Sequence, residues 1–153
     1  MLWLRQNIFK HFEPIAARST FPVICLENMS NLDWETQLDK KLRNKYTASF
    51  MNDTKWRELW TLIAEHSLRL SMAYADDPDW NAATLWGPFS SNLVGERGIK
   101  DPGIGGPFLY KQILSICIPK SNEQFNLFIS DVSRLGQLPI TESEDSFEIV
   151  AYR

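Results

Sequence analysis

Residues 76–80, with the sequence DDPDW, place three carboxylates within four positions. Oxygen ligands this close together can hold a divalent cation, although the alternating acids and distal glutamate of a calcium-binding loop are missing. Pro78 inside the run is typical of an exposed β-turn, and acids on such a turn can also face a basic partner protein. The spacing is compatible with three interpretations: a structural turn, an acidic projection that binds a partner protein, and a metal site. The residues concerned in partner binding are Asp76, Asp77, Asp79 and the adjacent Trp80.

A second acidic group lies near the C-terminus, in the segment TESEDSFE, and the same three interpretations apply to it. Its candidate partner-binding residues are Glu142, Glu144 and Asp145. Tryptophan side chains often supply the buried anchor of a protein interface. Trp86 therefore joins Trp80 as a candidate anchor.

The segment DPGIGGPF, residues 101–108, has the composition of a phosphate-binding loop. A dinucleotide loop needs G-x-G-x-x-G between a strand and a helix, so that the helix N-terminus faces the phosphate. Here Gly103, Gly105 and Gly106 are followed by Pro107 and a strand pattern, and no Lys-Ser/Thr pair completes a Walker motif. We predict a flexible connection that adapts to a partner, and we expect no cofactor.

The nucleophilic and ligating side chains form no catalytic pattern. His11 and His66 lack neighbours at metal-ligand spacing, and His66 stands at a predicted helix end, which the helix dipole favours by itself. Cys117 lies between isoleucines, whereas a reactive thiolate needs a polar, electropositive setting. No G-x-S-x-G is present. We expect neither metal nor enzyme activity; the alternative left open is a hydrolase with an acidic site at Asp77 and Asp79.

Charge is distributed unevenly along the 153 residues, whose net charge is −3. The first fifty residues carry seven Lys/Arg against five Asp/Glu, and the remainder carries nine against fourteen. Nucleic-acid binding draws on cationic side chains that meet phosphates. The larger, acidic part therefore suits a basic protein surface and not nucleic acid.

The N-terminal sequence and the cysteines favour a cytoplasmic protein. Charges at Arg5 and Lys10 interrupt any signal-peptide core, and no stretch approaches the ~18 apolar residues of a membrane span. Cys25 and Cys117 each lie in an apolar run and are predicted to be buried free thiols.

Apolar periodicity predicts the elements. Residues 2–18 form a helix interrupted at Pro14, and residues 21–27 an extended edge segment. Helices follow at 30–45 and from a cap at Asn52 or Asp53. Strands are expected at 68–75, 83–89 and 109–119, the last central, with one long loop at 90–107. A capping box of Ser121 and Gln124 opens a helix that Gly136 ends, and residues 138–141 and 147–153 form the closing strands.

Strands joined by short turns pair antiparallel. The fold class is therefore α+β over residues 51–153: a mostly antiparallel sheet of about five strands with helices packed on one face. Residues 1–50 are an N-terminal helical extension packed on this main domain.

The segments GPFLYKQILSICIP, LPITES and FEIVAYR, together with NDTKWRELW, carry a family resemblance over residues 51–153. The chain resembles a family of small uncharacterised bacterial proteins, a domain of unknown function with a central pFxYKxIxWIxI segment. Leu114 and Ser115 stand where an acid and a tryptophan are expected. The resemblance brings no catalytic residues.

In character the chain is also similar to immunity proteins, which block a cognate toxin of a contact-dependent or type VI secretion system. That likeness implies a cytoplasmic protein that occludes the toxin's active site by steric and electrostatic contact. Two alternatives to an immunity protein stay open. One is the hydrolase described above, and the other is a homodimeric structural module in which residues 1–50 pack between subunits.

Overall fold

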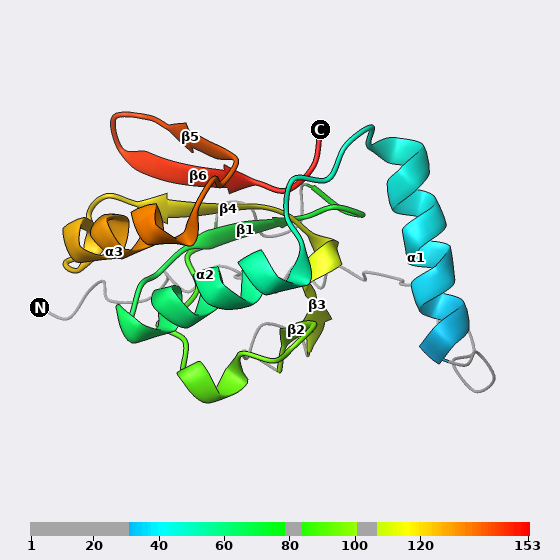
Figure 1. The fold of residues 1–153 in the computed structure, drawn as a ribbon, viewed down its shortest axis with the longest axis horizontal. Coiled ribbons are helices and arrows are strands. Elements are labelled where there is room, and N and C mark those ends of the chain that lie inside the picture. Colours follow the sequence, from blue (N-terminus) through cyan, green and yellow to red (C-terminus); the bar gives the residue numbers. More distant parts are fainter. Residues whose placement is uncertain (1–30, 79–83, 101–106) are drawn as a thin grey trace, which may run out of the picture.

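The computed structural model describes residues 31–78, 84–100 and 107–153 (Figure 1). The elements predicted within residues 2–27 lie outside these ranges. So do Cys25, Asp79, Trp80 and the glycines of residues 103–106.

Three α-helices and six strands make up the described chain. In order they are α1 (Asn31–Lys45), α2 (Asp53–Glu65), β1 (Ser71–Tyr74), β2 (Gly98–Ile99), β3 (Phe108–Leu109), β4 (Ile113–Pro119), α3 (Phe125–Val132), β5 (Ile140–Glu142) and β6 (Ser146–Val150). Short 3-10 turns occupy Ser91–Leu93, Tyr110–Gln112 and Ser133–Leu135. None of the helices in the described ranges has the length and apolar content that crossing a membrane requires.

The strands form a four-stranded antiparallel sheet in the order β1-β4-β6-β5 and a separate two-stranded sheet of β2 and β3. The predicted α+β class is confirmed, and β4 is central as expected, since it pairs with β1 on one side and β6 on the other. The strands divide into four and two instead of about five in one sheet.

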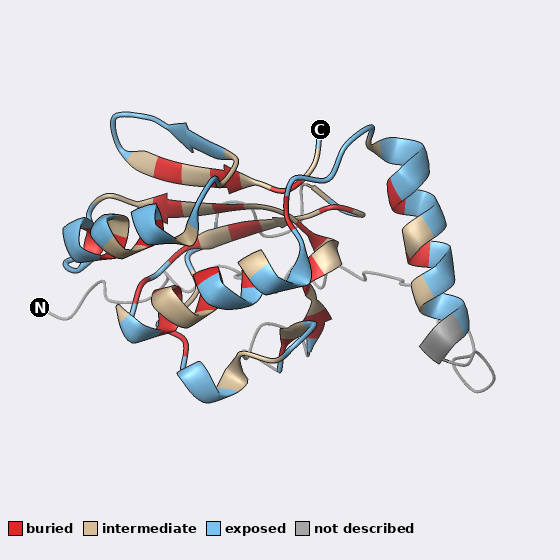
Figure 2. Ribbon diagram, viewed as in Figure 1, coloured by how far each residue is buried: buried red, intermediate tan, exposed pale blue. Residues whose placement is uncertain are grey.

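The main core lies between this sheet and the helices α2 and α3, which run side by side (Figures 1 and 2). Ile113, Ile116 and Ile118 of β4 are fully buried. Large aromatic rings fill the space opposite them, including Trp60, which packs edge-on against Phe89.

Helix α2 follows its sequence pattern closely. The Asn52 side chain accepts a hydrogen bond from the backbone N–H of Lys55 at 2.9 Å, so the predicted cap is present. The apolar stripe becomes the buried face, and its members are Trp56, Leu59, Trp60 and Ile63. Burying an apolar side chain of this size contributes about 1.5–3 kcal/mol, so tertiary contacts hold the helix.

Helix α1 packs on a second, smaller apolar cluster. Leu38 and Leu42 meet Ala75, with Leu114 and Tyr152 at the border. Leu114 lies at an irregularity in the register, where Ala73 pairs with Ser115 and Tyr74 with Ile113, so it packs on this cluster although Ile113, Ile116 and Ile118 lie in the main core. The helix predicted at residues 30–45 is therefore confirmed, and it touches a different side of the sheet from α2 and α3.

Two predictions between β1 and β4 are wrong. Residues 84–89 form no strand and pair only through a bridge between Trp86 and Leu70, because Gly87 has a φ of +104° and Pro88 has no N–H to donate. The predicted loop at 90–107 contains a 3-10 turn and strand β2. Gly98 allows this, since β2 approaches β3 very closely there.

Two further predictions fail around β4. No capping box opens α3: the helix starts at Phe125, after Gln124, without a side-chain cap. Cys117 is a free thiol but only partly buried, because it faces away from the side of β4 that carries Ile116 and Ile118. Gly136 has the expected positive φ, +84°.

Replacing Gly98 with alanine should destabilise the fold by about 3 kcal/mol, because the new β-carbon would overlap the backbone carbonyl of Phe108 and force the two strands apart. Gly136→Ala is the control. Its β-carbon would meet no atom within 4 Å, so only its positive φ is strained and about 1 kcal/mol should be lost. Urea unfolding measures both; equal losses would contradict the close approach of β2 to β3.

Stability should fall as pH rises from 10 to 12. Burial raises the pKa of Tyr74, Tyr110 and Tyr152 from 10.0 to about 12. A pKa that is higher in the folded than in the unfolded chain stabilises the fold below pH 10, and this contribution is lost between pH 10 and 12. Urea unfolding at pH 9 and pH 11, with the absorbance of phenolate followed at 295 nm, tests this. Ionisation of all tyrosines near pH 10 in a folded chain would contradict it.

Candidate functional site

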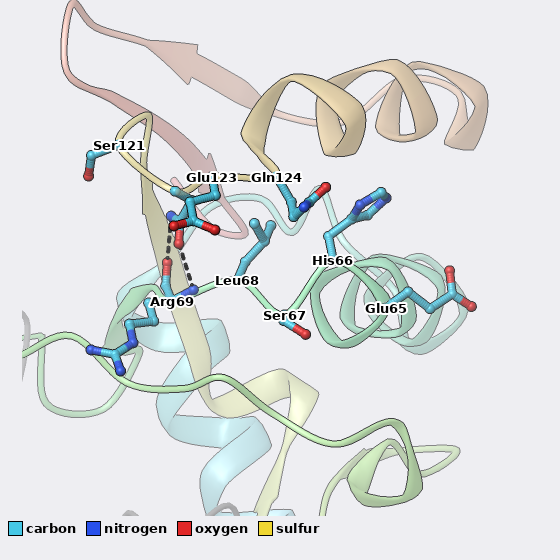
Figure 3. Close-up of a pocket in the computed structure, with 9 residues that line it drawn as sticks. Glu65, His66, Ser67, Leu68, Arg69, Ser121, Glu123 and Gln124 are labelled. Carbon is cyan, nitrogen blue, oxygen red and sulfur yellow. Dashed lines mark hydrogen bonds between the residues drawn. The ribbon is translucent and has the colours of Figure 1, made fainter.

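A hollow of about 640 Å³ lies where α2 gives way to β1 and β4 gives way to α3 (Figure 3). We call it the loop hollow. Its lining residues are Glu65, His66, Ser67, Leu68 and Arg69 from the first loop and Ser121, Asn122, Glu123 and Gln124 from the second.

The Asn122 side chain joins the two loops. Its Oδ1 accepts from the backbone N–H of Arg69 at 2.9 Å, and its Nδ2 donates to the carbonyls of Arg69 at 3.0 Å and Pro119 at 2.7 Å. The side-chain amide thus pairs with both the N–H and the carbonyl of Arg69, as the backbone of a neighbouring strand would. Arg69 lies two residues before β1 begins. Asn122 was not among the predicted site residues, because no local sequence pattern indicates that its side chain bonds to a distant loop.

Ser67 turns the chain out of α2. Its φ of +51° is the left-handed conformation usually taken by glycine after a helix. The backbone N–H groups of Ser67 and Leu68 donate to the carbonyls of Ala64 and Ile63, so the last turn of the helix is satisfied. A serine in this conformation costs about 1 kcal/mol, which the buried Leu68 beside it offsets.

His66 is a structural link between α2 and α3. Its Nε2 lies 2.9 Å from Oδ2 of Asp131, whose other oxygen accepts from Arg134 at 3.2 Å. Its ring also packs edge-on against Phe128. The prediction that His66 ends a helix is correct, and Asp131 is the partner that sequence spacing did not reveal.

The polar side chains of the loop hollow do not converge. Figure 3 shows His66 directed toward α3 and the Ser67 hydroxyl directed to the other side of the loop. Glu65 and Arg69 likewise extend in opposite directions. Activation of a serine needs a histidine within hydrogen-bond reach, which this arrangement does not provide. The hollow can instead offer hydrogen bonds and charge to a molecule that covers it.

The two predicted acidic clusters lie at opposite ends of the sheet. Register pairs Tyr74 with Ile113 at one end of β4 and Ser146 with Pro119 at the other, and a strand of that length spans about 20 Å. Asp76 and Asp77 follow β1 at the first end, whereas Glu142, Glu144 and Asp145 surround the β5–β6 turn at the second (Figure 1). One compact partner site does not include both.

Helix α1 bonds to the backbone beside the first cluster. Lys45 and Tyr46 donate to the carbonyl of Ala75 at 2.9 Å and 2.8 Å, and Lys41 lies 3.5 Å from the carbonyl of Asp76. The carboxylates of Asp76 and Asp77 form no ion pair with any described residue.

Trp86 is partly buried at the border of the main core. It packs against the main core, and its indole nitrogen is buried without a hydrogen-bond partner in the described ranges. Its neighbour across the bridge is Leu70, so register places it away from Asp76 and Asp77.

The second cluster lies beside the loop hollow. Glu142 bonds to Lys120 at 2.7 Å, but Glu144 and Asp145 are exposed and form no ion pair with any described residue. The backbone N–H of Lys120 donates to the carbonyl of Asp145 at 2.9 Å, which places this turn directly beside the loop hollow. Glu123 and Glu65 add exposed carboxylates there.

Groups of three or more His, Cys, Asp or Glu side chains that could hold a metal ion do not occur in the described ranges. Comparison with family models, curated proteins and solved structures gives no match for this chain.

Asn122→Ala should lower the free energy of unfolding by about 2 kcal/mol, because three hydrogen bonds between the loops are lost. Asn126→Ala is the matched control, since Asn126 is exposed on α3 and its loss should change stability by less than about 0.5 kcal/mol. Urea unfolding compares the two. Equal stabilities would show that Asn122 does not hold the loops together.

Proposed function

We propose that this chain is an immunity-type protein that binds a cognate protein toxin through the acidic edge of its sheet and covers the toxin's basic active-site region. The acidic edge is defined as β5, the β5–β6 turn and the adjoining loop hollow. The observation that carries the proposal is an exposed edge strand beside Glu144 and Asp145, whose carboxylates have no ion-pair partner in the described chain.

All three residues of β5 are exposed, and β5 is the last strand of the sheet. One side of its backbone therefore faces away from β6, and an extended segment of another protein can add to it. Ile140 is 42% exposed on this strand and supplies an apolar contact beside the charges.

The charges at the acidic edge favour a cationic partner. Glu65, Glu123, Glu144 and Asp145 have no ion pair in the described ranges, while Arg69 is the cation of the same hollow. Surfaces of opposite charge accelerate association and exclude wrong partners. A toxin that cleaves nucleic acid has a basic active site, and a carboxylate-lined surface would occupy it as a substrate does.

The test uses the protein encoded next to this chain as the candidate toxin. Co-expression should protect cells, and the double variant Glu144→Gln/Asp145→Asn should weaken binding about 10-fold, or about 1.4 kcal/mol, with a shallower dependence on salt. The matched control is Asp76→Asn/Asp77→Asn, which removes the same charge at the opposite end of the sheet and should change binding less than about 2-fold.

Absence of both binding and protection would overturn the proposal. Equal weakening by the two double variants would overturn the assignment to the acidic edge. Light scattering of the chain alone gives a third check: a stable dimer that Ile140→Lys converts to monomer would show that the edge is occupied by a second copy.

A further inference from the structure

A second hollow, of about 470 Å³, lies between the first turns of α1 and the β2–β3 hairpin. We call it the hairpin hollow. Its apolar side is formed by the exposed Trp34 and the half-buried Leu109, together with the buried Ile99 and Phe108. Trp34 is 43% exposed, so its indole ring is accessible to a ligand.

The hairpin hollow exists because two glycines let the backbone close up beside it. A β-carbon on Gly98 would overlap β3, and one on Gly95 would lie 2.8 Å from the carbonyl of Gly98. Both glycines line the hollow. The ion pair between Arg97 and Glu35, 2.7 Å, ties the same hairpin to α1.

The polar groups left available in this hollow are hydrogen-bond donors. Lys100 lines it, and its ammonium has no hydrogen bond or ion pair with any described residue. Gln112 accepts from the backbone N–H of Leu109 at 2.8 Å through Oε1, and its amide NH₂ donates to no described residue.

The one carboxylate of the hairpin hollow among the described residues is already neutralised. Glu35 accepts from Arg97 at 2.7 Å and lies 3.4 Å from Lys111, and the hydrogen bond from Arg97 lowers its pKa. Lys111 is shared with Asp39 at 2.8 Å. The described residues of the hollow therefore offer no free carboxylate to a metal cation. They offer an anion one free ammonium, that of Lys100, which balances a single negative charge and not two.

From this balance we propose that the hairpin hollow binds a small amphipathic monoanion: a flat apolar group with one carboxylate. The apolar body packs against Trp34 and Leu109, and the carboxylate meets Lys100 and the amide of Gln112. The volume lies within the ~300–1,000 Å³ usual for small-molecule sites, which are apolar with a few orienting polar groups. The hairpin hollow lies at the end of β4 away from the acidic edge, so this proposal does not rest on the proposed function.

The test is a titration of the ¹⁵N-labelled full chain with 2-naphthoate, followed by NMR. The indole N–H signal of Trp34, assigned by its loss in Trp34→Phe, should shift saturably with a dissociation constant of about 1 mM, the affinity that ~13 ligand atoms give at ordinary ligand efficiency. Lys100→Met should weaken binding about 10-fold, and Lys100→Arg should retain it.

Two controls make the result specific. Uncharged 2-naphthamide has the same shape and should bind wild type as weakly as 2-naphthoate binds Lys100→Met. Lys40→Met removes an exposed cation from α1 outside the hairpin hollow and should leave binding unchanged. Equal binding of the acid and the amide, equal effects of the two lysine variants, or shifts that miss the Trp34 signal would each overturn the proposal.

The carboxylate can come from a free acid or from the C-terminus of a peptide that ends in an aromatic residue. A short peptide ending in Phe, compared with its C-terminal amide, distinguishes the two sources. Tighter binding than 2-naphthoate identifies a chain terminus, and weaker binding identifies a free acid.

Discussion

Burial of β4 is the constraint on which the rest of the structure depends. Its pairing with β1 and β6 satisfies its backbone on both sides, and Ile113, Ile116 and Ile118 are removed from water by α2 and α3. The register shifts at Leu114, because Ala73 pairs with Ser115 and Tyr74 with Ile113. At this irregularity the strand presents Leu114 to α1. One apolar strand thus organises both clusters.

The two ends of β4 differ in how far the charged side chains around them are paired, and this difference bears on where a partner would bind. At its start, carboxylates and cations alternate between α1 and the body: Lys111 meets Asp39 and Glu35, and Arg97 meets Glu35. At its end, Glu144 and Asp145 stand exposed beside the loop hollow. Charges that are already paired inside a molecule have little to offer a partner, whereas unpaired ones can steer its approach.

The connections between elements depend on single residues that bond or approach at long range. Asn122 joins two loops whose sequences lie 53 positions apart, and His66 reaches Asp131 across 65 positions. Gly98 lets β2 come close to β3. Each of these contacts fixes the shape of a hollow, so the two hollows are products of the fold and not of any one segment.

The sequence by itself determined the elements whose signal is local: α1 and α2 from their apolar spacing, the Asn52 cap, β4 from its apolar run, and the hairpin around the acidic turn. It also determined the α+β class, because short turns between strands leave few ways to pair them. Tertiary structure alone decided which of these elements and side chains contact one another. It separated the acidic clusters by the length of a strand, brought Lys45 and Lys41 to the carbonyls of Ala75 and Asp76, and turned Cys117 away from the core. Within the strand predicted at 83–89, residues 84–89 form a single bridge instead. Periodicity describes which face of an element is apolar, but which side chains meet across the fold depends on register and packing between segments distant in sequence.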